Sequence, residues 1–103
     1  MSQYQLSEAA AEDFGSIFEF SIDHFGQDQA IKYAYGLKAR FSKIAQSPRQ
    51  YPAVDHIAPD YRRSVYGSHA IYYRTRSDYT LIVRILGQQD AGTALRVGPS
   101  HVR

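Results

Sequence analysis

The residues from Tyr61 to Leu86 contain three runs of β-branched and aromatic residues, separated by two short turn signals. Gly67-Ser68 lies between the first two runs, and a glycine that tolerates positive φ at this place is typical of a tight hairpin. Arg76-Ser77-Asp78 separates the second run from the third. The pattern predicts a three-stranded antiparallel meander. Because three strands with an uncovered apolar face are only marginally stable, the rest of the chain must cover one face or extend an edge.

Two amphipathic helices are predicted upstream of the meander. Ser7 is a suitable N-cap for the first helix and Gly26 a suitable end. Its apolar stripe consists of Phe14, Ile17, Phe18, Ile22 and Phe25, with Phe20 off the stripe as either an isolated exposed side chain or a partner contact. The second helix starts near Asp28, stops at Pro48 and places Ala30, Tyr33, Ala34, Leu37, Phe41, Ile44 and Ala45 on one face. With only Gly26-Gln27 between them, the helices must form an antiparallel hairpin that is wide enough to cover a sheet.

The last run of the meander is almost continuously apolar, which favours a central strand. The short alternating segment Tyr4–Leu6 is the natural neighbour for it. The predicted fold class is therefore α+β, with the order β-α-α-β-β-β and an antiparallel sheet covered on one face by the helical hairpin. The Arg49–Asp60 connection contains prolines and no clear period. It serves either as a crossover, with Tyr51 and Val54 on the edge of the core, or as a functional loop.

Composition limits the function classes. A chain of 103 residues has room for one domain, which we place at residues 1–90, followed by a partly flexible tail at 91–103. The start lacks the pattern of a signal peptide and no run is long enough to span a membrane, so we expect a cytoplasmic protein. The absence of cysteine excludes thiol catalysis, the four histidines are too scattered for a metal site, and no cofactor is expected. A formal charge of +2 permits an acidic partner without requiring nucleic acid.

The motifs of serine hydrolases, phosphate-binding loops and zinc proteases are absent. One chemistry is compatible with the residues present, namely RNA cleavage through its own 2′-hydroxyl, which needs a base, an acid and cations. Arg62 and Arg63 are neighbours on a strand and should point to opposite faces. His69 serves either in a local hydrogen bond or as a base, and Arg84, inside an apolar strand, needs a paired carboxylate or an open surface.

A series of short motifs extends along residues 4–90, namely Tyr4–Ala10 with Asp13, Phe25-Gly26, Leu37–Phe41, Ser47-Pro48, Tyr61–Arg63, Gly67-Ser68-His69-x-Ile71-x-Tyr73-Arg74 and Val83–Leu86. In the order and spacing of these motifs, the chain resembles the ParE branch of the RelE/ParE toxin superfamily. It implies the toxin of a type II toxin–antitoxin pair that inhibits or poisons DNA gyrase without being an enzyme. It also implies neutralisation by a ParD-like ribbon-helix-helix antitoxin, formation of a hetero-oligomer, and contact with operator DNA only through that antitoxin.

Two alternatives stay open at this point. RelE-like relatives share the fold and are ribosome-dependent mRNA endonucleases, so the fold does not separate them. Those nucleases carry an acid or base just beyond the last strand and Lys or Arg residues in the connection, whereas here Gly87 follows Leu86 and the connection has a single Arg. This difference favours gyrase. The other alternative is a non-toxic protein that serves only as an antitoxin partner and co-repressor.

For the antitoxin we expect docking over the helical hairpin and the exposed edge of the sheet, through apolar anchors and acidic side chains. No membrane partner is expected. The predicted partner-binding residues are Arg62, Arg63, Tyr66, His69, Arg74, Arg84, Gln88 and Gln89.

Overall fold

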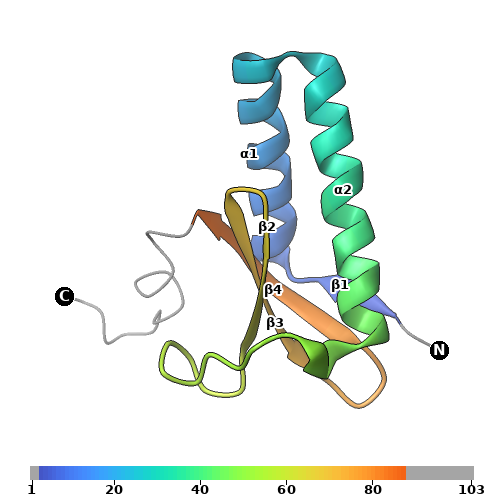
Figure 1. Cartoon of the computed structure of the whole chain (residues 1–103), viewed down its shortest axis with the longest axis vertical. Helices are drawn as coiled ribbons and strands as arrows, with labels where there is room; N and C mark the ends of the chain where they lie inside the picture. The colour runs from blue at the N-terminus through green and yellow to red at the C-terminus, as the bar shows by residue number, and fades with distance from the viewer. Residues whose placement is uncertain (1–2, 88–103) are drawn as a thin grey trace.

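A computed structural model describes residues 3–87 of the chain. Its elements, labelled in Figure 1, are β1 (Tyr4–Leu6), α1 (Glu8–Phe25), α2 (Gln27–Gln46), a short 3₁₀ helix (Pro48–Gln50), β2 (Arg62–Tyr66), β3 (His69–Thr75) and β4 (Thr80–Gly87). The predicted α+β class and element order are confirmed. Within the described residues, neither helix has a stretch long and apolar enough to cross a membrane.

The two helices form the predicted antiparallel hairpin. The Ser7 side chain caps α1 by accepting the N–H of Ala10 at 2.9 Å. Gly26 alone separates the helices, and its φ of 90° is a conformation that favours glycine. Figure 1 shows the hairpin standing upright and reaching beyond the β2–β3 turn. The tip of the hairpin therefore has no sheet beneath it.

The sheet has the strand order β1-β4-β3-β2, so β4 is central, as predicted. The three strands of the meander are antiparallel as predicted, but the prediction of a fully antiparallel sheet is wrong, because β1 pairs with β4 in parallel, with Tyr4 opposite Thr80, and the sheet is mixed. The helical hairpin and the connection return the chain to the end of the sheet where β1 begins. As a result, β2 runs in the direction of β1, and after two reversals so does β4.

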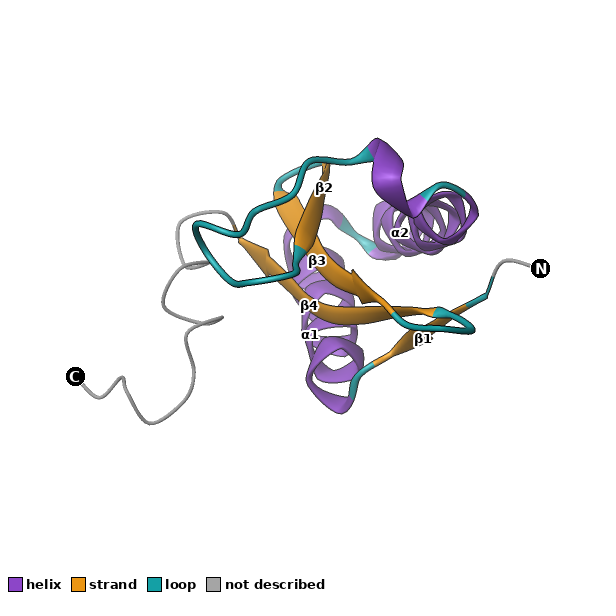
Figure 2. Ribbon diagram, turned by 90° about the horizontal axis from the view of Figure 1, so that it is seen from below, coloured by secondary structure: helices purple, strands orange, loops and turns teal. Residues whose placement is uncertain are grey.

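Two apolar clusters lie on opposite faces of the sheet. The larger packs both helices against one face, through Ile17, Leu37, Phe41, Ile44, Ile71, Tyr73, Ile82 and Ile85 among others. The smaller lies on the other face, where Val54, Ile57 and Tyr61 of the connection meet Ala70, Tyr72 and Leu86. Figure 2 shows the connection, in teal, running from α2 to β2. The connection is thus a crossover that covers part of the second face, and Val54 is fully buried in it.

The apolar stripe predicted for α1 faces the core, but the structure does not bury all of its residues. Ile17 is buried and Phe14 packs against the larger cluster, yet Phe25 is 67% exposed. Phe20, off the stripe, is 55% exposed. Both residues lie near the tip of the hairpin, where no strand is available to cover them.

Candidate partner-binding surfaces

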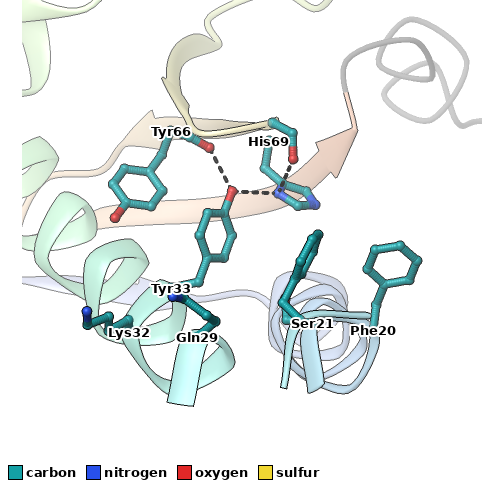
Figure 3. Close-up of a pocket in the computed structure, with 9 residues that line it drawn as sticks. Phe20, Ser21, Gln29, Lys32, Tyr33, Tyr66 and His69 are labelled. Atoms are coloured by element: carbon teal, nitrogen blue, oxygen red, sulfur yellow. Dashed lines mark hydrogen bonds between the residues drawn. The ribbon is translucent and has the colours of Figure 1, made fainter. Parts of the chain in front are cut away.

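A hydrogen-bonded cluster joins α2 to the β2–β3 turn (Figure 3). The hydroxyl of Tyr33 lies 3.0 Å from the carbonyl oxygen of Tyr66 and 2.8 Å from Nδ1 of His69. A phenol has one proton, so when Tyr33 donates it to the Tyr66 carbonyl, its oxygen accepts a hydrogen bond from the Nδ1–H of His69. Burial lowers the pKa of His69 and so favours the neutral ring. In this tautomer, Nε2 of His69 is a hydrogen-bond acceptor.

A groove of about 520 Å³ opens beside this cluster, between the tip of the hairpin and the β2–β3 turn. Its apolar walls include Phe20 and Phe25, and its polar groups include Lys32, Ser68 and His69. Figure 3 shows the residues that line it, with Phe20 and Ser21 on one helix and Gln29, Lys32 and Tyr33 on the other. An apolar groove of this kind is suited to a partner segment that carries an apolar anchor, a carboxylate that accepts from the Lys32 ammonium group, and a hydrogen-bond donor for Nε2 of His69.

The aromatic floor of this groove depends on two close approaches. A Cβ atom at Gly36 would lie 1.7 Å from the Tyr66 hydroxyl oxygen, so the Tyr66 ring occupies the space that a side chain at this position of α2 would take. Gly67 has φ 58°, and a Cβ there would lie 2.5 Å from the Tyr33 hydroxyl oxygen. The guanidinium of Arg40 lies 5.3 Å from the centre of the Tyr66 ring and donates to the carbonyl of Val65 at 2.8 Å. These contacts fix the β2–β3 turn against α2.

The arginines of the meander do not form one patch. Arg62 lies opposite Tyr73, which faces the helices, and donates to the carbonyl of Tyr51 at 2.7 Å. Arg63 lies opposite Tyr72 on the other face, 5.9 Å from the centre of that ring. The prediction that these two neighbours point to opposite faces is confirmed.

Arg74 lies 5.5 Å from the centre of the Tyr61 ring and, with Arg62, lines a second hollow beside the connection.

Arg84 has a carboxylate partner within the chain. Its Nε lies 2.7 Å from Oδ2 of Asp13, its other donor lies 3.0 Å from Oδ1, and the same Oδ2 accepts the backbone N–H of Ile85 at 2.9 Å. The hydrogen bond to Asp13 is the main cause of the raised pKa of Arg84. Of the two roles that the sequence leaves open for Arg84, the structure shows the paired one.

Comparison with known proteins identifies the family. Residues 4–92 match the sequence model of the ParE toxin of type II toxin–antitoxin systems, parDE. The chain belongs to the ParE toxin family. It is 37% identical over 89 residues to Toxin ParE1 of Mycobacterium tuberculosis strain H37Rv, covering 85% of this chain and 91% of that protein. It is 34% identical over 88 residues to Toxin ParE1 of Caulobacter vibrioides, with the same coverage.

The fold is also that of a chain in a solved structure. The chain superposes on a chain of a chromosomal ParDE toxin–antitoxin system from P. aeruginosa with a TM-score of 0.73 and 18% sequence identity. The superposition covers 84% of this chain and 96% of that chain. At this identity, the match establishes the shared fold.

In this ParE toxin the predicted partner-binding residues fall into separate places. Tyr66 and His69 meet at the groove, Arg62 and Arg74 at the second hollow, and Arg63 and Arg84 on and beside the sheet. Gln88 and Gln89 lie outside the described residues. The role of Tyr33 was not predicted from the sequence. The spacing of apolar residues on α2 placed Tyr33 on the core face, and such spacing indicates the face of a helix but not the residues that a side chain contacts. Phe20 was the one sequence feature that pointed to the groove, because an aromatic side chain outside the apolar stripe of its helix does not face the core and is expected on the surface.

Proposed function

We propose that this ParE toxin inhibits DNA gyrase in the cytoplasm and is neutralised by a ParD-like antitoxin. The observation that carries the proposal is the match to the ParE family along residues 4–92, which spans every described element. The name of the related P. aeruginosa system, ParDE, supports an antitoxin partner. We further propose that operator DNA is reached only through the antitoxin.

The end of β4 supports a target other than RNA. Gly87 pairs with His69 in the β3–β4 register, so the position where a RelE-like nuclease carries an acid or a base has no side chain. His69 itself is hydrogen-bonded to Tyr33 and its neutral form is favoured. Among the described residues that line the groove there is no carboxylate, so no acidic side chain lies beside His69 to stabilise a protonated imidazole.

The groove supports the antitoxin arm as its occupant. Phe20 and Phe25 expose more than half of their surface, and an exposed aromatic pair beside a groove is typical of a docking site. We propose that the arm places an apolar side chain between these rings and a carboxylate near Lys32. The arm then continues along the outer edge of β2, where Val65 is 47% exposed.

Supercoiling and cleavage-complex assays with purified gyrase test the target. We expect micromolar toxin to reduce supercoiling or to accumulate cleaved DNA, and the purified antitoxin to reverse the effect. An unchanged assay would exclude gyrase as the target. Cuts mapped within codons of translated mRNA would then identify a ribosome-dependent nuclease, whereas normal growth after unopposed induction would identify a non-toxic antitoxin partner.

A further inference from the structure

The second hollow, of about 370 Å³, lies between the connection and the sheet, where β2 begins and β3 ends. Three arginines reach it from three separate segments, Arg49 from the 3₁₀ helix, Arg62 from β2 and Arg74 from β3. The sequence separates these residues by up to 25 positions, so their convergence is a product of the fold. Positive charge is therefore concentrated at one polar hollow on a protein whose formal charge is only +2.

None of these three arginines forms an ion pair within the described chain. Across residues 3–87, the ion pair that the structure contains joins Arg84 to Asp13, away from this hollow. Asp55 and Asp60 also line the hollow, and Oδ1 of Asp55 accepts the backbone N–H of Asp60 at 2.8 Å, which stabilises the turn. The guanidinium groups outnumber the carboxylates, and none of them is in ion-pair contact with one.

Two of the guanidinium groups are held in place by uncharged partners. Arg62 uses one N–H to donate to the Tyr51 carbonyl at 2.7 Å, and Arg74 lies against the Tyr61 ring. A guanidinium has five N–H donors in a planar arrangement, so both groups keep donors for a ligand. Guanidinium groups held in a fixed orientation are suited to bind a phosphate, because its oxygens can accept two parallel N–H hydrogen bonds from one guanidinium.

We propose that this hollow binds a phosphate group, with Arg74 and Arg62 as the principal donors and Arg49 as an additional positive charge. The ligand is either the phosphodiester backbone of a nucleic acid or a small phosphate compound, and both present the same oxygens. This binding site goes beyond gyrase inhibition and does not depend on it. No cleavage is implied, because the hollow is required only to hold the anion.

The test uses the full chain and two probes, inorganic phosphate by titration calorimetry and a fluorescently labelled single-stranded oligonucleotide by anisotropy. We expect salt-sensitive binding of at least one probe, because contacts to the oligonucleotide release its condensed counterions and salt screens the attraction between inorganic phosphate and the arginines. Arg74→Gln should weaken binding about fivefold or more and reduce the salt slope by about one unit, whereas Arg74→Lys should retain part of the affinity. Arg76→Gln, in the β3–β4 turn outside the hollow, is the matched control and should change binding less than about twofold.

Each outcome decides the question. Binding of the oligonucleotide that Arg74→Gln weakens and Arg76→Gln does not supports a nucleic-acid ligand. The same pattern with inorganic phosphate alone supports a small phosphate compound. Absence of binding with both probes, or an equal loss in both variants, would overturn the proposal. Arg49→Gln, which alters an exposed side chain, provides a second variant if Arg74→Gln unfolds more readily, and gyrase assays remain a separate measurement.

Discussion

Asp13 and Arg84, 71 positions apart, meet at the edge of β4 that β1 leaves open. β1 pairs only with Thr80 to Ile82 of β4. Beyond β1, the backbone N–H of Ser7 donates to the Ile82 carbonyl at 2.9 Å and its hydroxyl donates to the Val83 carbonyl at 2.8 Å, while Asp13 accepts the N–H of Ile85. The first half of α1 thus satisfies the backbone groups that a longer β1 would have paired.

Replacement of Asp13 by Ala should therefore destabilise the fold although Asp13 lies on a helix. The substitution removes three hydrogen bonds, two of them to a charged donor, and leaves Arg84 without its carboxylate. We expect a loss of about 2 kcal/mol in the free energy of unfolding, measured by urea denaturation. Glu12→Ala, at the exposed neighbouring position, is the control, and equal effects from the two variants would contradict this role for Asp13.

His69 should make stability depend on pH. Burial lowers the pKa of His69 in the folded state, so the unfolded chain takes up this proton at a higher pH than the folded chain. Stability should then fall as the pH falls from about 6.5, the ordinary histidine pKa, to the lower folded-state value. His69→Asn, which keeps a donor for Tyr33, should flatten this dependence in urea unfolding experiments.

The control for His69 is His56→Asn, which alters an exposed side chain on the connection. It should leave the pH dependence unchanged. A decline in stability that is parallel in the parent and in His69→Asn would assign the effect to another group.

Substitution by alanine should change the stability of the protein in opposite directions at Gly15 on α1 and at Gly36 on α2. Gly15→Ala meets nothing within 4 Å and should stabilise the protein by about 0.5–1 kcal/mol, because alanine is the better helix former. Gly36→Ala places a methyl group against the Tyr66 ring, which Arg40 also holds, and should cost about 1–3 kcal/mol. Thermal unfolding measures both, and stabilisation by Gly36→Ala would show that the Tyr66 ring moves freely.

The fold was largely predictable because local signals agreed with one another. Ser7, Gly26 and Gly67 marked the helix start, the helix turn and the hairpin, and the apolar run of β4 marked the central strand. The pairing of Asp13 with Arg84 was not predictable, because no local pattern encodes a contact between distant positions. The exposure of Phe25 was missed for a related reason. Periodicity gives the direction of a helix face but not the point at which the sheet beneath it ends.

The candidate groove was only partly predictable. His69 and Tyr66 were identified on their strands, but Tyr33 was read as a core residue from its place on the α2 stripe. Its hydroxyl reaches the β2–β3 turn because Gly67 has no side chain to block it. The approach of a helix to a turn depends on both elements together, so neither segment alone indicates it.

Charge reversal of Arg62 and Arg63 should slow antitoxin association. The pair occupies both faces of the β2 edge, so Glu at both positions repels an acidic arm whichever face it follows. We expect an association rate constant about tenfold lower and a weaker dependence on salt, measured by stopped-flow fluorescence with the purified antitoxin. Lys43→Glu with Arg76→Glu changes the net charge equally at other exposed sites. Equal slowing in both double variants would attribute the effect to net charge alone.

Truncation of Phe25 should separate binding from folding. Because Phe25 is 67% exposed, Phe25→Ala should change the free energy of unfolding by no more than about 0.5 kcal/mol. If the antitoxin arm enters the groove, the same substitution should weaken the complex about tenfold or more, as expected for an aromatic anchor. Tyr35→Ala is a closely matched control, since Tyr35 is 68% exposed and lines a smaller hollow on the helical hairpin. Titration calorimetry measures both affinities, and a loss confined to Tyr35→Ala would move the docking site from the groove to that smaller hollow.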